Sequence, residues 1–385
     1  MIRSGFTADP RYPWLYRAEF NSADDIYPFL SRNHDLWGTG LESEWIFRGQ
    51  DNDYPLLPKA WRDSTRYGLG RIQRKFFYKT ICIISSRDTS DNCFHPFRHH
   101  FTHHRDEDAS AAFANKYARK AAAAFCTFLA EADAIRWFAR FSDQIGLSLP
   151  DIETPSETEA LRQAGTLIQD WSLPDGGYNH QRSRGHEWWF NWRPNELFGL
   201  AQHYGVPTRL LDWTYEPRFA GFFATKGAQM EGQGNICVYG LSLAKLHSFS
   251  THANDSARAN AELSEDELVL GLGGVRAWEL TCRRSQNENL HAQQGLFTYT
   301  RGGESYYMAR GRWPTLLDTL DLRYKIAQTD PTKPVMIQLC LPKSEAGNLR
   351  RLLYRDGISA AHMFPGFSNI WETVEWRLDQ DQWDS

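Results

Sequence analysis

The alternation of apolar and polar positions along the chain predicts several short strands. Compact apolar runs are typical of buried strands, and we expect strands at residues 44–49, 235–241, 295–300 and 334–341, of which residues 235–241 are rich in β-branched and aromatic side chains. Residues 208–213 follow a break at Gly205 and Pro207 and predict a further strand-like or turn segment. The alternation at residues 373–378 predicts an edge strand near the end of the chain.

A long central block shows helical spacing instead. Residues 109–141 are rich in alanine and repeat their apolar side chains at helical spacing, so we expect residues 65–194 to be mainly helical. Shorter helices are predicted at residues 22–30, after Asn195, and at residues 219–225 and 344–354. These patterns predict an α+β fold in which a large helical insertion interrupts a small mixed or antiparallel β core.

The composition is that of a globular protein with a buried core. Hydrophobic residues make up 41% of the 385-residue chain and charged residues 23%, which is enough apolar material for a buried core. A formal charge of -4 gives no broad basic field, so contact with nucleic acid would have to be local. Six scattered cysteines without a C-x-x-C pair favour reduced thiols, and the first residues lack the apolar run of a signal peptide or membrane span. We therefore expect a cytoplasmic protein with no membrane partner.

Arg48 is the first candidate for a functional residue. It comes at the end of an apolar strand and precedes Gly49, whose missing Cβ allows a sharp turn or a close approach by a ligand. A guanidinium can hold a phosphate or carboxylate through two parallel hydrogen bonds. The alternative is a structural arginine paired with a carboxylate such as Asp212.

A second group of polar and aromatic residues lies between residues 201 and 214. His203 is a candidate acid, base or ligand near neutral pH, Arg209 a candidate for holding a second phosphate, and Asp212 a candidate for orienting either of them. A lone histidine of this kind is also a common structural group. The run of histidines from His95 to His104 has spacings that suit zinc or nickel on a helix, but its flanking arginines would repel a cation. We therefore expect no metal there and interpret the run as a surface loop or an RNA-contacting patch.

Three motifs together resemble the FRG-domain family. They are Phe47-Arg48-Gly49-Gln50, the run from Gln202 to Thr214 that includes His-Tyr-Gly-x-Pro-Thr-Arg-Leu-Leu-Asp-Trp, and Gln294-Gly295-Leu296-Phe297. The resemblance spans about residues 40–370. It implies that residues 1–64 and 195–370 form the FRG domain, that residues 65–194 are inserted into it, and that residues 371–385 form an edge strand and tail. Members of the family look like bacterial and phage proteins, which implies a toxin or phage-defence setting.

The strand that carries Arg48 also resembles the first strand of ADP-ribosyltransferases. That resemblance implies an ADP-ribosyltransferase-like fold, with Arg48, His203 and Asp212 as catalytic residues. It also implies a site for NAD, with Tyr204 or Trp213 stacking on nicotinamide. The NAD-binding residues would be Arg48, Gly49, Gln50, Tyr204, Thr208, Arg209, Trp213 and Gln294.

The sequence departs from the ADP-ribosyltransferase pattern at one place. Gln294 stands on the strand expected to supply a glutamate, and an amide cannot stabilise a positively charged transition state as a carboxylate does. Two hypotheses follow. The first is an enzyme that uses NAD for ADP-ribosyl transfer or NAD cleavage, with a protein or nucleic acid as acceptor, and the second is a module that binds or senses a nucleotide or nucleic acid without chemistry.

Overall fold

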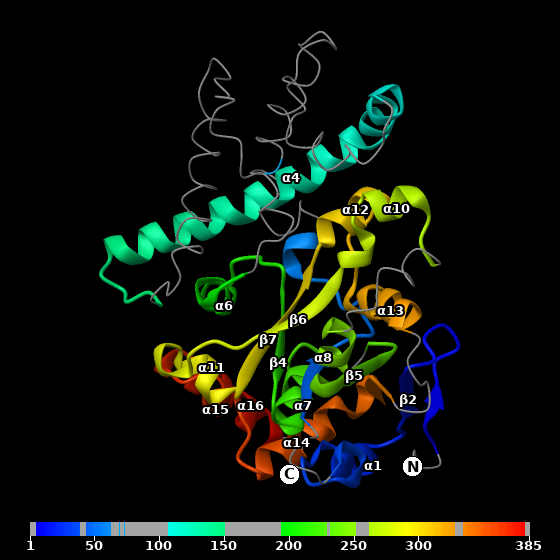
Figure 1. The fold of residues 1–385 in the computed structure, drawn as a ribbon. Coiled ribbons are helices and arrows are strands. Elements are labelled where there is room, and N and C mark those ends of the chain that lie inside the picture. Colours follow the sequence, from blue (N-terminus) through cyan, green and yellow to red (C-terminus); the bar gives the residue numbers. More distant parts are fainter. Residues whose placement is uncertain are drawn as a thin grey trace.

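The structure is a computed structural model that describes residues 5–38, 44–62, 69, 73, 107–150, 194–228, 232–251, 262–327 and 334–381. Its strands form one eight-stranded mixed sheet covered by helices, which confirms the predicted α+β class (Figure 1). Only β2 and β8 run parallel; the other neighbouring strands of these ranges are antiparallel. In spatial order the strands are β1 (Thr7–Ala8), β2 (Leu15–Glu19), β8 (Met336–Pro342), β5 (Asn235–Ser242), β3 (Trp45–Gln50), β4 (Leu210–Thr214), β7 (Gly295–Arg301) and β6 (Arg276–Leu280).

The two central strands, β3 and β4, are paired over a single residue pair. β3 pairs with β5 along its whole length, and β4 does the same with β7. Between β3 and β4, however, the pairing consists of Phe47 opposite Thr214 alone. Residues 48–50 and 210–213 therefore face one another without forming a ladder, and this gap is where the candidate site lies.

Helices cover both faces of the sheet. On one face, α7 (Pro217–Lys226), α14 (Ala346–Arg355) and α1 (Ala23–Ile26) pack around Phe47 and Phe222. On the other face, α8 (Leu243–Thr251) and α13 (Leu316–Ala327) cover a core that contains Trp213. The shorter helices are α6 (Glu196–His203), α10 (Glu265–Val269), α11 (Glu288–Ala292), α12 (Gly303–Arg310) and α15 (Ala360–Met363), with single 3-10 turns at η1 (Tyr27–Leu30), η2 (Asp35–Trp37), η3 (Lys59–Trp61), η6 (Leu272–Gly274), η7 (Arg284–Gln286) and η8 (Lys343–Glu345).

Gly49 allows α7 to lie directly on β3. A Cβ added at this position would stand 1.8 Å from the carbonyl oxygen of Ala220 and 2.6 Å from the amide nitrogen of Ala224. Both atoms belong to the backbone of α7, so no side chain could move aside. The glycine therefore permits close packing of a helix on a strand, rather than the sharp turn suggested by the sequence.

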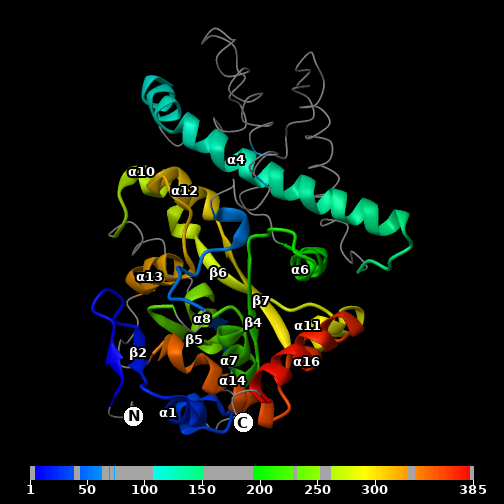
Figure 2. The same cartoon turned by 180° about the vertical axis from the view of Figure 1, so that it is seen from behind.

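The long helix expected at residues 109–141 is α4 (Glu107–Gln144). It crosses one end of the sheet, above α6 and α12 in Figures 1 and 2. Glu131 of α4 is buried and bonded to Arg209, which ties the helix to the loop before β4. The rest of the predicted helical block, with the histidine run from His95 to His104, lies outside the described residues.

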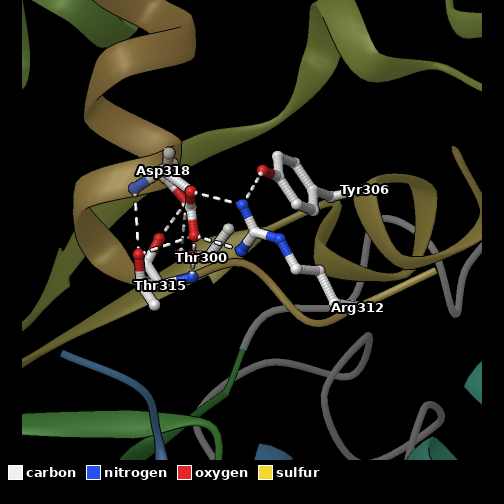
Figure 3. Close-up of polar contacts among 6 residues, drawn as sticks. Thr300, Tyr306, Arg312, Thr315 and Asp318 are labelled. Atoms are coloured by element: carbon white, nitrogen blue, oxygen red, sulfur yellow. Dashed lines mark hydrogen bonds and ion pairs between the residues drawn. The ribbon is translucent and has the colours of Figure 1, made fainter. Parts of the chain in front are cut away.

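A polar cluster fixes the connection between α12 and α13 (Figure 3). Both terminal nitrogens of Arg312 donate to the carboxylate of Asp318, at 2.6 and 2.7 Å, and one of them also donates to the hydroxyl of Tyr306. Asp318 in turn accepts from the amide and the hydroxyl of Thr315, just before α13 begins. The bidentate pair thus sets where α13 starts relative to α12.

The predicted edge strand at residues 373–378 is wrong, because these residues belong to helix α16 (Phe367–Asp381). A six-residue alternation is too short to decide between strand and helix. The longer pattern of Phe367, Ile370, Trp371, Val374 and Leu378 has spacings of three and four residues, as a helix requires. Among the helices that the structure describes, none is both long and apolar enough to cross a bilayer.

Candidate functional site

A cavity of about 770 Å³ opens where β3 and β4 lose their pairing. Its wall contains residues of β3 and of the loop that follows it. Further wall residues come from the last turn of α6, from β4, from the end of α7, and from Gln293 and Phe364. The lining residues are Phe47, Arg48, Gly49, Gln50, Asp51, Tyr54, Pro55, Leu57, Lys59, Arg62, Gln202, His203, Asp212, Trp213, Thr214, Phe223, Lys226, Gly227, Gln293 and Phe364.

Arg48 and Asp212 meet across the gap between the two strands. Nη1 of Arg48 donates to the main-chain oxygen of Asp212 at 2.8 Å and lies 3.5 Å from its Oδ2. Burial lowers the pKa of Arg48, although the charge of Asp212 opposes this shift. Because an arginine titrates far above neutral pH, the guanidinium remains charged. The Arg48 side chain is 14% exposed, so it lines the cavity while it is paired with Asp212.

Asp212 is held as a carboxylate on the cavity wall. Burial by itself would raise the pKa of Asp212, but the charge of Arg48, together with a hydrogen bond from Gln202 Nε2 at 3.0 Å, lowers it below its usual value. Half of the side chain, 49%, remains exposed. An ionised carboxylate is therefore available to a ligand at neutral pH.

His203 is the last residue of α6, and its ring packs edge-on against Phe297 with 5.6 Å between centroids. Burial lowers the pKa of His203, and the nearby charge of Asp212 only partly opposes this. The imidazole is thus neutral at pH 7. Its Nε2 is buried and has no hydrogen-bond partner within the described residues.

Three residues on the wall contain buried polar atoms that nothing in the described chain satisfies. They are Arg48 at Nε, Gln50 at Oε1 and His203 at Nε2. Leaving such an atom unpaired costs about 1–3 kcal/mol in a folded protein, so partners from water or a ligand are expected. Their concentration around one cavity indicates a ligand site.

The cavity carries an excess of positive charge and several rings. Four of its side chains are cationic and two are carboxylates, which favours an anionic guest. Tyr54, Phe223 and Phe364 add aromatic surface. Sequence reasoning did not assign Tyr54, Lys59, Lys226 or Phe364 to the site. The first two closely follow the Arg48 strand in sequence, whereas the other two come from distant parts of the chain.

The prediction that Arg209 holds a phosphate is wrong. Its side chain is 2% exposed, with Nη2 and Nη1 at 2.8 and 2.9 Å from carboxylate oxygens of Glu131 and Glu304. Burial would lower the pKa of Arg209, but these two carboxylates raise it. Thr208 is also buried and donates to Gln202, so neither residue lines the cavity. Both support the backbone that delivers Asp212.

The predicted stacking residues are also placed elsewhere. Tyr204 is 66% exposed, packs against Phe138, and is not part of the wall. Trp213 borders the cavity, but its ring is buried in the sheet core and donates to Thr298 Oγ1 at 2.8 Å. Neither ring is positioned to stack on a ligand in the cavity.

Gln294 does not reach the cavity either. It has a left-handed backbone, with φ of 46°, and its carbonyl accepts from the amide of Tyr215. The neighbouring Gln293 lines the cavity instead, while its amide group donates to the carbonyl of Met363. The structure therefore brings together Arg48, Gly49, Gln50, His203, Asp212 and the border residue Trp213 of the predicted site, and leaves out Tyr204, Thr208, Arg209 and Gln294.

Comparison with known proteins identifies one family. The sequence model of the FRG domain matches residues 165–233. The described part of this match contains α6, β4 and α7, and therefore His203 and Asp212 of the cavity wall. No curated protein and no solved structure matches the chain. Residues 165–233 are therefore similar to the FRG domain, and the Arg48 strand faces this matched segment across the same cavity.

Proposed function

We propose that the cavity binds NAD and that the protein is an enzyme of ADP-ribosyl transfer or NAD cleavage. The observation that carries this proposal is the Arg48–Asp212 pair on the wall of a cationic cavity whose volume suits a cofactor-sized ligand. The unpaired Nε of Arg48 and Oε1 of Gln50 supply further polar contacts.

The charges and rings of the cavity suit a dinucleotide. Arg48, Lys59 and Arg62 lie within one short stretch of the wall and would hold the pyrophosphate, because cationic side chains bind phosphate through charge-assisted hydrogen bonds. Tyr54, Phe223 and Phe364 offer faces for the flat rings of the ligand.

Asp212 would supply the negative charge that glycosidic cleavage requires. As the bond between nicotinamide and ribose breaks, nicotinamide leaves with the bonding electrons and the ribose becomes oxocarbenium-like, which an ionised carboxylate stabilises. Water or an acceptor then bonds to the ribose carbon and loses a proton. Neutral His203 is the candidate base for that proton.

The biological setting follows from the family resemblance and from this chemistry. An enzyme that consumes NAD, or that modifies a protein or nucleic acid with its ADP-ribosyl group, would act as a toxin or phage-defence effector. Residues 371–381 and α4 do not line the cavity wall.

The test is release of labelled nicotinamide from NAD by the purified chain, with and without candidate protein and nucleic-acid acceptors. Asp212→Asn is expected to slow release by about 100-fold or more, while NAD binding persists. Arg48→Ala is expected to weaken NAD binding itself. Arg310→Ala, which changes an arginine outside the cavity that is paired with Glu267, is the matched control and should leave both unchanged.

Two other outcomes would replace this proposal. Saturable binding of NAD without release under any acceptor condition would favour the alternative of a nucleotide-sensing module. Absence of binding to NAD, nucleoside diphosphates and short single strands would remove both.

A further inference from the structure

The C-terminal helix α16 attaches to the molecule by its polar side. Glu372 accepts from Lys226 Nζ at 3.0 Å, and the hydroxyl of Thr373 accepts from the amide of Ala361 at 2.9 Å. On the same side, the Trp376 ring lies 4.9 Å from the ring of Tyr354. These three positions are spaced as one face of a helix.

The opposite side of α16 is apolar and faces solvent. Phe367 is 93% exposed and Trp371 is 60% exposed, and the other members of this stripe are Ile370, Val374 and Leu378. Figure 2 shows α16 (red) along the edge of the molecule, next to α14 and α11. A surface helix normally buries its apolar stripe and exposes its polar side, so the orientation of α16 is reversed.

We propose that this stripe, the outer face of α16, binds the apolar side of a basic amphipathic helix of another protein. Residues 367, 370, 371, 374 and 378 follow the spacing of anchor positions in helix-mediated recognition. The aromatic side chains Phe367 and Trp371 are of the kind that dominate such interfaces.

Charge selects the kind of partner. The sequence of α16 contains four acidic residues and one arginine, and because Glu372 is paired with Lys226, the remaining side chains carry a formal charge of -2. Two copies of α16 facing one another would bring like charges together, and an anionic lipid surface would repel the helix for the same reason. A partner helix edged by lysine or arginine would instead be attracted.

This surface is separate from the cavity wall, since none of its five residues lines the cavity. The inference therefore goes beyond the proposed function and does not depend on it. One link between the two exists, because Lys226, which holds Glu372, also lies 4.1 Å from the ring centroid of Phe364 on the cavity wall.

The test uses the full chain and a fluorescent helical peptide with leucine at heptad positions a and d and lysine at positions e and g. Anisotropy titration should show saturable binding, and a double variant, Phe367→Ser with Trp371→Ser, should weaken it by at least about tenfold. A matched peptide with glutamate in place of lysine should also bind at least about tenfold more weakly. Trp137→Ser, which removes an exposed aromatic side chain of α4, is the control variant and should bind like the wild type.

Three results would overturn the proposal. The first is peptide binding that the double variant leaves unchanged. The second is concentration-dependent dimerisation of the wild type, seen by light scattering and lost in the double variant, which would identify a second copy as the occupant. The third is binding to vesicles of anionic lipid that is lost in the double variant, which would identify a membrane. Circular dichroism confirms that the variants are folded in each case.

Discussion

The guanidinium of Arg48 is held from one side only. Nη1 is bound by Asp212 through its main-chain oxygen, whereas Nε is buried and without a partner in the described chain. A planar group fixed in this way is oriented before a ligand arrives, and an anion gains hydrogen bonds without paying to order the side chain. Arg48 can therefore pair with Asp212 and still bind an anionic ligand.

Replacing Arg48 by lysine should show whether this geometry matters. Lysine keeps the charge but loses the planar set of donors, so we expect NAD to bind about tenfold or more weakly. Calorimetric titration measures the change. The control is Lys59→Arg, which keeps charge at a half-buried position of the wall and should bind at least as well as the wild type. Equal affinity of the Arg48→Lys variant would contradict a directed contact.

His203 should make stability depend on pH. Burial keeps its folded-state pKa below the usual histidine value of 6.5, so the unfolded chain takes up the proton first as the pH falls. The contribution of the neutral ring is complete above pH 6.5 and is lost as the pH falls through the lower, folded value. The slope for one proton is at most about 1.4 kcal/mol per pH unit.

Urea unfolding between pH 7.5 and 5 measures this dependence. His203→Gln removes the titrating group and should flatten the part of the curve below pH 6.5, when it is compared with the wild type. An identical slope in both proteins would show that His203 is protonated equally easily in the folded and unfolded states.

Some residues of the site could be predicted from the sequence, and the roles of others could not. The pairing of Arg48 with Asp212 could be predicted because the sequence has few arginines at the end of an apolar strand and few aspartates within a distinctive motif. The role of Arg209 could not be predicted, since its partners Glu131 and Glu304 lie 78 and 95 residues away along the chain. No local spacing connects residues so far apart, and the same polar motif suits a phosphate or a buried carboxylate.

At the scale of elements, strands with strong composition were predictable and the final helix was not. The runs that became β3, β5 and β7 contain several β-branched and aromatic residues, and the run that became β8 is almost continuously apolar. In α16 the apolar residues face solvent, so the usual link between apolar periodicity and burial does not hold there. The assumption that the apolar face of a helix is its buried face gives the wrong orientation for α16.

The contact between β3 and α7 gives a prediction for Gly49. Gly49→Ala places a methyl group against the backbone of α7, and overpacking of this kind typically costs about 1–3 kcal/mol, with more where the backbone must move. Gly274→Ala is the control, because a Cβ there would meet nothing within 4 Å. Thermal and urea unfolding should separate the two variants clearly. If both are equally stable, α7 does not lie on β3 as the structure places it.

At the scale of the whole molecule, the cavity depends on the packing of distant segments. Its wall combines residues 47–62, 202–214 and 223–227 with Gln293 and Phe364. The family match covers only residues 165–233 and thus only part of this wall. The fold supplies the remainder by placing β5 and β7 on either side of the separated strands β3 and β4.

The buried triad of Arg209, Glu131 and Glu304 joins α4 and α12 to the loop that leads into β4. Arg209→Ala would leave two buried carboxylates without their cation, and breaking a buried pair in this way costs about 3–5 kcal/mol. Lys325→Ala is the control, since the Lys325 side chain, paired with Asp321 one turn away, is 59% exposed and exposed pairs contribute about 0–1 kcal/mol. Urea unfolding at pH 7.5 measures both.

The pH dependence of the Arg209→Ala variant identifies the cause of its instability. Burial raises the pKa of Glu131 above the usual glutamate value of 4.5 even with Arg209 present, and without that cation the pKa should rise further. The folded variant then binds a proton that the unfolded chain releases, so its deficit begins as the pH rises above 4.5 and increases towards neutrality. Lowering the pH from 7.5 to 5 should therefore restore part of the lost stability relative to the wild type. A deficit that stays constant over this range would point to lost packing around Arg209, with no unpaired carboxylate involved.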